Sequence, residues 1–316
     1  MRTADIVLSA YNARLFLEAQ IESLRHQTHR TWRLWARDDG STDGTTRLLT
    51  DLGRSDERIH VHPPDGRNLG PAGAFSWLLE NLPPDARYVF TCDADDVWLP
   101  DKVALSLEAM IQAEEKSGGP LLLHTDLRVT DEDLNVRNPS LWDHLGLDLR
   151  PLTLRRLMVE NVVTGPTVLL NRSMVDRIRP IPREAPYQDW WMALVAAAFG
   201  RIVTLEEATV LYRRHGTNIT DEVEKREKTT FHLVREMVAI WSRTPELRKW
   251  LSISAGQAAL FVERFRGDLR PEEVRMMEEY AEIPSLGFFR RKMRVLRHRA
   301  LRHHGLARNV ALLLRA

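Results

Sequence analysis

Three aspartates lie within four positions at the end of an apolar segment. The stretch YVFTCDADDVWLPDKV, residues 88–103, places Asp93, Asp95 and Asp96 directly after a strand-like run. Carboxylates held this close repel one another unless protons or a cation neutralise them. A Mg²⁺ or Mn²⁺ ion takes one or two carboxylates and completes its shell with water and substrate phosphates. The stretch predicts either such a metal site for a nucleoside diphosphate or, as the alternative, a solvated acidic turn that caps a helix near Pro100.

A second polar stretch, RDDGSTDGT, follows another strand-like segment. Ser41, Thr42 and Asp43 are candidate N-caps of a helix, and capping accounts for the hydroxyls and glycines. Capping does not account for Asp38 and Asp39, which end the strand. A carboxylate at that place can accept hydrogen bonds from a ribose hydroxyl or a base N–H, so both functions remain open for this stretch.

The first strand-like segment is followed by SAYNARLF, which contains no glycine. A dinucleotide-binding site requires Gly-x-Gly-x-x-Gly at that point, and a P-loop requires Gly-Lys-Ser/Thr. Phosphates would therefore be held by a metal and by side chains. Arg67 and Asn68, at the start of an expected helix, are candidates for one such contact.

The elements that position these residues follow from the apolar periodicity. Strands are expected at residues 5–10, 31–37, 58–62 and 87–92, with helices at 13–28, 39–53 and 70–82 between them. This alternation is typical of a parallel sheet covered by helices on both faces. Ligands bind such sheets beyond the carboxyl ends of the strands. All the unusual polar residues fall at those ends, so one rim of the sheet should carry the site.

The remaining chain divides into two regions. We expect one or two strands in 120–131, a strand in 162–172 after a Gly-Pro turn, a buried helix in 189–200 and two strands with a loop in 201–218. Helical stripes follow at 229–241, 246–265 and 271–282. The pattern predicts an α/β domain over residues 1–220 and a helical region over residues 221–316.

Composition excludes several classes of protein. The 316 residues include 45 basic and 44 acidic side chains, so bulk charge does not favour a nucleic-acid partner. Cys92 is the single cysteine, which excludes an internal disulfide and favours a reducing compartment. The N-terminus does not resemble a signal peptide, and no apolar run approaches the roughly 18–20 residues of a membrane helix. We expect a cytoplasmic protein.

With these residues in view, IVLSAYNARLFLEAQ, RDDGSTDGT, NLGPAGAF and CDADDVWLPDKV resemble the family-2 glycosyltransferases over about residues 5–220. The resemblance implies the GT-A nucleotide-diphospho-sugar transferase fold. The segments TGPTVLLNR, YQDWWMALVAAAFG and YRRHGTN further resemble the bacterial rhamnosyltransferases. Members of that branch use dTDP-L-rhamnose to build surface polysaccharides.

The resemblance also implies roles for individual residues. Five positions match those that contact the nucleotide base and ribose or lie beside them: Ser9, Tyr11, Asn12, Asp38 and Asp39. Asp93 and Asp95 match the Asp-x-Asp pair that holds Mg²⁺ or Mn²⁺ against the diphosphate, and His215 matches a position that completes this site. Asp189 falls where inverting members have their catalytic base. At Gln188 the chain departs from relatives that often have histidine there, which puts acceptor recognition in doubt.

Three further residues are candidates for the sugar site. Asp96 lies beside the Asp-x-Asp pair, and the aromatic faces of Trp190 and Trp191 suit the apolar side of a pyranose. The alternative for both tryptophans is core packing, because they lie on an apolar helix. The implied reaction is metal-dependent, inverting transfer from a nucleotide sugar to a saccharide or lipid-linked saccharide. A non-catalytic nucleotide- or glycan-binding protein remains an alternative, and a sugar-nucleotide pyrophosphorylase is disfavoured because it requires a glycine-rich basic stretch after the first strand.

The C-terminal segment is basic. From Ile283 onward the chain contains no acidic residue, and Phe289, Met293 and Leu296 form an apolar stripe among arginines. Such a basic amphipathic segment favours peripheral binding to an anionic membrane surface. The alternatives are a helix packed on the main domain and a dimer contact.

Overall fold

A computed structural model describes residues 2–147, 149, 151–215, 244–287, 290–291 and 293–294. The chain separates into two compact units. The first unit contains Met1–Leu145 and Val163–Asn218, and the second contains Gly146–Val162 and Ile219–Ala316. Residues 146–162 thus cluster with the helical region, although the sequence pattern assigns them to the α/β domain.

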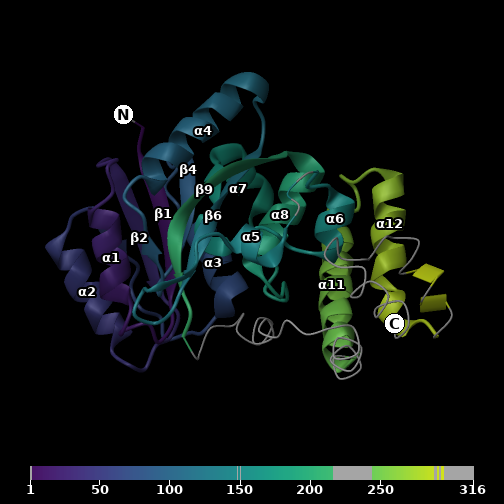
Figure 1. Cartoon of the computed structure of the whole chain (residues 1–316), viewed down its shortest axis with the longest axis horizontal. Helices are drawn as coiled ribbons and strands as arrows, with labels where there is room; N and C mark the ends of the chain where they lie inside the picture. Colours follow the sequence, from purple (N-terminus) through teal and green to yellow (C-terminus); the bar gives the residue numbers. More distant parts are fainter. Residues whose placement is uncertain are drawn as a thin grey trace. The chain divides into compact units, whose positions relative to one another are not determined.

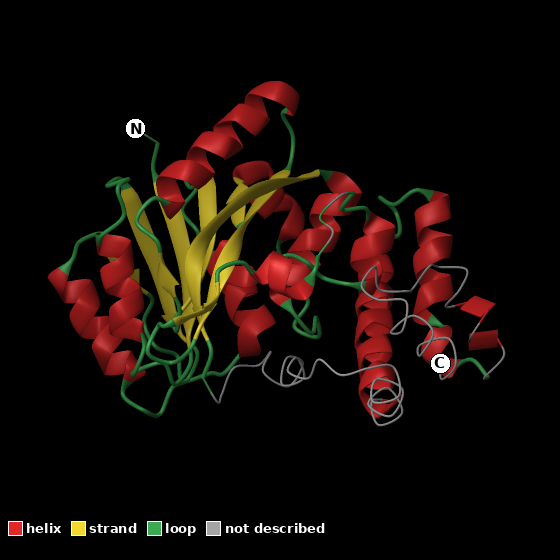
Figure 2. Cartoon of the chain, in the orientation of Figure 1, coloured by secondary structure: helices red, strands yellow, loops and turns green. Residues whose placement is uncertain are grey.

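Within the described residues, one sheet of nine strands forms the centre of the first unit (Figures 1 and 2). The strands are β1 (Ala4–Ala10), β2 (Trp32–Asp38), β3 (Ile59–Val61), β4 (Tyr88–Asp93), β5 (Val97–Trp98), β6 (Leu121–Thr130), β7 (Val136–Asn138), β8 (Leu169–Asn171) and β9 (Arg201–Arg213). Their order is β3-β2-β1-β4-β8-β6-β9-β5, with β7 paired to β6. The strands β1 to β4 pair in parallel, as do β6 and β9, whereas β8 is antiparallel to both its neighbours. The predicted α/β fold with a mostly parallel sheet is confirmed.

Helices cover both faces of this sheet. They are α1 (Leu17–Arg25), α2 (Thr45–Ser55), α3 (Gly70–Glu80), α4 (Lys102–Ser117), α5 (Leu141–Leu145), α7 (Arg172–Ile178) and α8 (Gln188–Phe199), with the 3-10 turn η1 (Gly165–Thr167). Ile6 and Leu8 of β1 belong to the core cluster that includes residues of α1, α2 and α4. Successive strand residues point to opposite faces, so Val7 faces the other layer. Helices α3, α7 and α8 pack on that second face (Figure 1).

The parallel register brings distant segments to one edge. Ser9 pairs with Asp93, and Ala10 pairs with Asp38. The carboxyl ends of β1, β2 and β4 are therefore level with one another. The loops that follow these strands meet at a single rim.

Three expectations about individual elements were wrong. Residues 201–213 form one strand, because β9 pairs with β6 along most of its length across register shifts. Most of the strand expected in 162–172 is irregular or part of η1, and only Leu169–Asn171 is extended. Helix α2 begins after Gly44, whose φ of 97° is left-handed and favours glycine, so none of the three predicted residues is its N-cap.

The second unit is helical where it is described. It contains α6 (Leu154–Val159), α11 (Thr244–Phe265), α12 (Pro271–Ala281) and the turn η2 (Ile283–Ser285). Helix α11 packs against α6 and α12, and the Ser254 and Tyr280 hydroxyls are 2.8 Å apart. The helices expected at 246–265 and 271–282 are confirmed. The stripe at 229–241, together with Phe289 and Leu296 of the basic tail, lies outside the described residues.

Membrane-spanning helices were sought in the described part of the chain. Every helix there is too short or too polar to cross a bilayer.

Gly200 is required by a close approach of two chain segments. A Cβ at this position would lie 2.3 Å from the Pro120 carbonyl oxygen and 2.7 Å from Met174 Cε. We expect Gly200→Ala to lower the free energy of unfolding by about 1–3 kcal/mol, because the backbone of residue 120 must move. Urea denaturation followed by circular dichroism measures this change. Gly256→Ala is the matched control, since its Cβ meets no atom within 4 Å; equal stability of the two variants would contradict the prediction.

Candidate active site

Asp93 occupies the last position of β4, in the centre of the rim. Burial, together with the neighbouring carboxylates of Asp95 and Asp189, raises the pKa of Asp93 to about 8. An aspartate in this state is poorly stabilised as an anion unless a cation approaches it. Asp93 and Asp189 are 96 positions apart in the chain, and only the fold brings them together.

Asp95 is tied to the end of β9. His215 Nε2 lies 3.0 Å from Asp95 Oδ2, and the His215 ring stacks on Phe16 with 4.6 Å between the ring centroids. The Asp95 side chain is 31% exposed, so it can contact both the imidazole and a ligand at the rim. Of the three predicted metal ligands, the structure thus places Asp95 beside both Asp93 and His215.

Asp96 has a different place from its two neighbours. It is fully buried, and its Oδ1 accepts a hydrogen bond from the Arg213 amide at 3.0 Å. Arg213 Nε also donates to the Asp95 carbonyl at 2.9 Å. The burial of Asp96 argues against the predicted contact with the sugar. Asp96 instead anchors the acidic turn to β9.

The structure disfavours the alternative in which the acidic turn caps a helix. Helix α4 begins at Lys102, and its N-cap residue is Asp101. In the part of the chain that is described, the carboxylates of Asp93, Asp95 and Asp96 accept no hydrogen bond from the α4 amides. Their arrangement needs another explanation.

The residues present fit a divalent metal. Across the described residues, no group of three or more His, Cys, Asp or Glu side chains is arranged as a preformed metal site. The pair Asp93 and Asp95 nevertheless supplies two hard oxygen donors whose mutual repulsion a cation would relieve. Two carboxylates suffice for Mg²⁺ when substrate phosphates and water complete its shell.

Asp189 is held in place by two backbone amides. Its Oδ2 accepts from the Gly165 amide at 3.0 Å, and its Oδ1 accepts from the Trp190 amide at 2.6 Å. Burial raises the pKa of Asp189 to about 6, while these hydrogen bonds oppose the rise. A carboxylate with this pKa is mostly ionised at neutral pH and is a stronger base than an exposed aspartate, which suits proton abstraction.

Trp190 and Trp191 are fully buried in α8. Neither ring lines an open surface in this structure, so the prediction that they form the sugar site is not supported. Helix α8 packs against β6, β9 and α7, which explains why its tryptophans are in the core.

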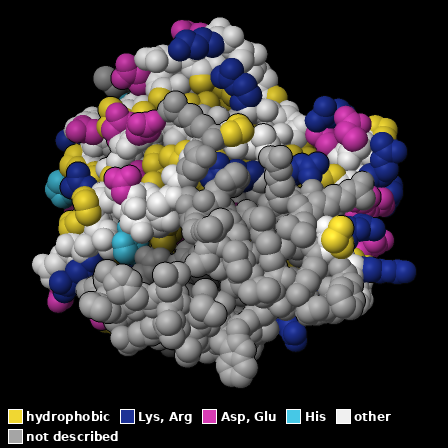
Figure 3. Space-filling view, turned by 45° about the vertical axis from the view of Figure 1, so that its right-hand side comes forward, with side chains coloured by type: hydrophobic (Ala, Val, Ile, Leu, Met, Phe, Trp, Pro, Cys, Tyr) yellow, Lys and Arg dark blue, Asp and Glu magenta, His cyan; other side chains and the backbone are white. Residues whose placement is uncertain are grey.

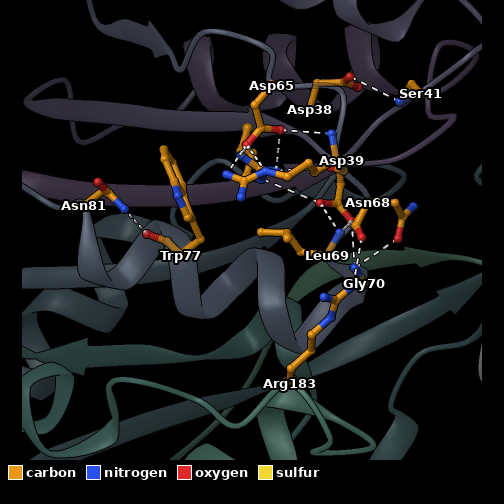
Figure 4. A network of polar contacts seen from close by, with 12 residues as sticks. Asp38, Asp39, Ser41, Asp65, Asn68, Leu69, Gly70, Trp77, Asn81 and Arg183 are labelled. Atoms are coloured by element: carbon orange, nitrogen blue, oxygen red, sulfur yellow. Dashed lines mark hydrogen bonds and ion pairs between the residues drawn. The ribbon is translucent and has the colours of Figure 1, made fainter.

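The two acids at the end of β2, Asp38 and Asp39, have separate contacts (Figure 4). Asp39 accepts from the Leu69 amide at 2.9 Å and the Gly70 amide at 2.9 Å, and it is 2% exposed. Asp38 accepts from Ser41 and Thr46 through Oδ2. Its Oδ1 is buried and has no hydrogen-bond partner among the described residues, so it can accept a hydrogen bond from a ligand.

Arg67 and Asn68 lie at the start of α3. Arg67 is paired with Asp65 at 2.8 Å, and Asp65 also binds the buried Arg37 at 2.9 Å (Figure 4). Asn68 accepts from the Gly70 amide through its side chain and from Arg183 through its carbonyl. Both residues are exposed at the rim, and their contact with phosphate stays a prediction.

The loop after β1 completes the rim. Ser9 is partly buried, whereas Tyr11 is 56% exposed. Asn12 has a φ of 49°, and it exchanges hydrogen bonds of 2.9 Å with Ser41 and Thr42. These bonds join the loop after β1 to the loop after β2, next to Asp38.

Sequence reasoning missed three residues that shape the site. Arg213 lies two positions before His215, and residues two apart in a strand share a face. The sequence could therefore have indicated that Arg213 lies beside the site. For Gly165 the sequence pattern predicts only a place in a Gly-Pro turn. Lys102 is fully buried, and burial lowers its pKa to about 7 against the effects of Cys92 and Asp96. A buried lysine could not be expected from an apparently surface-facing helix start.

Known proteins are similar to this chain in sequence and in fold. Residues 5–120 match the family Glycosyl transferase family 2. TuaG of Bacillus subtilis, named as a teichuronic acid biosynthesis glycosyltransferase, is 28% identical over 235 residues, 74% of this chain and 87% of TuaG. The Escherichia coli UDP-Glc:alpha-D-GlcNAc-diphosphoundecaprenol beta-1,3-glucosyltransferase WfgD is 30% identical over 108 residues, 34% of this chain and 41% of WfgD.

Two solved structures are similar in fold. S. aureus TarS 1-349 in complex with UDP-GlcNAc superposes with a TM-score of 0.54 at 15% identity, covering 99% of this chain and 89% of that one. The mannosyltransferase PcManGT from Pyrobaculum calidifontis, in complex with GDP-Man and Mn2+, has a TM-score of 0.53 at 16% identity, covering 98% and 78%. Residues 5–120 therefore match glycosyltransferase family 2, and the fold of the chain is the GT-A fold of these neighbours.

Proposed function

We propose that the chain transfers a sugar from a nucleotide diphosphate to a saccharide acceptor, with inversion at the anomeric carbon. The observation that carries this proposal is the meeting of Asp93, Asp95 and Asp189 at one rim. Gly165 lies beside two of them, because its amide binds Asp189 and a Cβ added to it would lie 3.8 Å from Asp189 Oδ2 and 3.8 Å from Asp93 Oδ2. A leaving-group site and a base on opposite sides of a reacting carbon are the two requirements of direct displacement.

Asp93 and Asp95 would hold a Mg²⁺ or Mn²⁺ ion, with His215 as a further ligand or as the group that orients Asp95. A divalent ion there neutralises charge that develops on the departing diphosphate. We propose that the nucleoside contacts Asp38, Ser9 and Tyr11, which lie at the ends of β1 and β2. Arg67 and Asn68 are exposed at the same rim, just before α3 begins.

Asp189 is the proposed base. The acceptor oxygen forms a bond to C1 as the bond from C1 to the diphosphate oxygen breaks, and the nucleoside diphosphate leaves with the electron pair. Asp189 accepts the acceptor's hydroxyl proton. The amides of Gly165 and Trp190 fix both carboxylate oxygens, so little reorganisation precedes the proton transfer.

The relatives support a role in cell-surface polysaccharide synthesis. The name of WfgD states a UDP-glucose donor and a diphosphoundecaprenol-linked acceptor, and that of TuaG states teichuronic acid biosynthesis. For this chain we propose a nucleotide-sugar donor and a saccharide or lipid-linked saccharide acceptor. The finer proposal is dTDP-L-rhamnose as donor, on the resemblance of TGPTVLLNR and YRRHGTN to the rhamnosyltransferases.

A lipid-linked acceptor would place the enzyme at a membrane surface. On the face shown in Figure 3, basic and acidic side chains of the described residues lie next to one another. The proposed peripheral contact is made by the acid-free segment after Ile283. Most of that segment lies outside the described residues.

Asp189→Asn should lower kcat at least about 1,000-fold, because an amide cannot accept the acceptor's proton. Binding of nucleoside diphosphate should change less than about three-fold by calorimetry, since Asp189 is not part of the nucleotide site. Asp51→Asn, whose side chain is 57% exposed on α2, is the matched control and should retain full activity. Unchanged turnover in Asp189→Asn would remove this residue from the base role.

Metal removal provides an independent test. Transfer should stop in EDTA and recover on addition of Mn²⁺ or Mg²⁺, because the repulsion between Asp93 and Asp95 needs a cation when diphosphate binds. Full activity in the chelator would contradict the metal site.

Calorimetry of dTDP, UDP and GDP in the presence of Mn²⁺ tests the donor. The rhamnosyltransferase proposal predicts at least about ten-fold tighter binding of dTDP than of the other two. A preference for UDP or GDP would leave the glycosyltransferase assignment intact and reject rhamnose.

A further inference from the structure

Phe16, in the loop after β1, contacts two side chains from the end of β9. Its ring stacks on the His215 ring, with 4.6 Å between the centroids and 26° between the planes. The guanidinium carbon of Arg213 lies 4.9 Å from the centroid of the same Phe16 ring. The face of an aromatic ring attracts a guanidinium and stacks favourably on an imidazole. One ring therefore packs against both side chains.

Both of these partners bind the acidic turn, residues 93–96. Arg213 donates from its amide to Asp96 Oδ1 at 3.0 Å and from its Nε to the Asp95 carbonyl at 2.9 Å. His215 Nε2 lies 3.0 Å from Asp95 Oδ2. The backbone and the carboxylate of Asp95 are thus each held by a residue that contacts Phe16.

The position of Phe16 is fixed by its own segment of backbone. Its amide donates to the Ala13 carbonyl at 3.0 Å, and its carbonyl accepts from the Gln20 amide of α1 at 3.2 Å. Helix α1 also holds the strand that follows the acidic turn, because the Trp98 amide of β5 donates to Ser23 Oγ at 3.0 Å. Phe16 therefore belongs to an element that is attached to the chain on the carboxyl side of the same turn.

A ring in this position restricts flexible side chains before any ligand binds. An arginine side chain loses rotamer freedom when it is held in a single geometry. When this freedom is already lost in the free protein, less of the ordering cost arises on binding. A leucine at position 16 would keep an apolar side chain there but would present no aromatic face to either partner.

We propose that Phe16 is a positioning residue of the metal site. It holds Arg213 and His215 against the acidic turn, so that the Asp95 carboxylate is preorganised for a divalent cation. Phe16 acts only through these two side chains. The inference rests on the proposed function for the identity of the ligand, whereas the positioning is a property of the metal-free protein.

Hydrogen exchange of the metal-free protein, measured by NMR, tests the positioning. In Phe16→Leu the Arg213 amide should exchange at least about five-fold faster than in the wild type, because its hydrogen bond to Asp96 opens more often. Phe16→Tyr retains the ring and should exchange like the wild type. Leu15→Ala is the matched control, since this neighbouring side chain is 84% exposed.

The Val7 amide, in the core of β1, reports on the stability of the whole sheet. It should exchange at the wild-type rate in every variant. Unchanged exchange at Arg213 in Phe16→Leu would overturn the inference. Equal acceleration at Val7 and Arg213 would also overturn it, because the ring would then contribute only to general stability.

Binding of Mn²⁺ tests the consequence for the site. Free Mn²⁺ is measured by electron paramagnetic resonance beside UDP, GDP or dTDP. Phe16→Leu should weaken Mn²⁺ binding about ten-fold with the tightest-binding nucleotide, as expected for the loss of a group that orients a metal ligand. Phe16→Tyr and Leu15→Ala should bind Mn²⁺ like the wild type.

The kcat of Phe16→Leu at saturating Mn²⁺ should return to within about two-fold of the wild-type value, because the proposed base Asp189 is unchanged. Unaltered Mn²⁺ affinity, or a loss of kcat that Mn²⁺ does not restore, would overturn the inference.

Failure of the proposed function has a different signature. A wild-type protein that bound no Mn²⁺ beside any of the three nucleotides would contradict the proposed metal site, and this result is visible without a variant. The exchange measurement requires neither metal nor nucleotide, so it decides the positioning role of Phe16 in either case.

Discussion

Electrostatic repulsion among carboxylates at the carboxyl ends of parallel strands is the constraint on which the remaining architecture depends. Asp93 closes β4 beside Asp95, and the packing of α8 brings Asp189 next to Asp93. Such a cluster persists only if neighbouring groups orient it. The end of β9 provides this support, because Arg213 binds the Asp95 carbonyl and Asp96 while His215 binds the Asp95 carboxylate. The length of β9, 13 residues, brings Arg213 to the rim, and a shorter strand would end before it.

The acids of the rim differ in function because their surroundings differ. The Asp39 carboxylate accepts hydrogen bonds from the Leu69 and Gly70 amides at the start of α3. A carboxylate there also interacts favourably with the helix dipole. Asp96 is buried against β9. Asp93, Asp95 and Asp189 are left at the site itself, and Asp38 keeps one oxygen without a described partner. Residue type alone does not separate these groups, since all are aspartates at strand or helix ends.

Much of the fold could be predicted from local pattern. The segments 5–10, 31–37 and 87–92 became the parallel strands β1, β2 and β4. Strands β1 and β4 are buried on both faces and have nearly continuous apolar segments, whereas β2 alternates between apolar and polar residues. The errors fell where tertiary contacts overrode local signals. Gly44, in a left-handed conformation, is the N-cap of α2 in place of the predicted Ser41, Thr42 or Asp43. Pairing with β6 joined two expected strands into β9.

The sequence by itself determined the fold class, the resemblance to family-2 glycosyltransferases and the rim at which polar residues gather, since these depend on periodicity and on motifs contiguous in the chain. Only the tertiary structure decided which acids face one another, that Trp190 and Trp191 are core residues, and that Gly165 lies between Asp93 and Asp189. The physical reason is that burial and the proximity of charges depend on contacts between segments roughly a hundred residues apart. Those contacts arise from strand register and helix packing, neither of which a local stretch of sequence specifies.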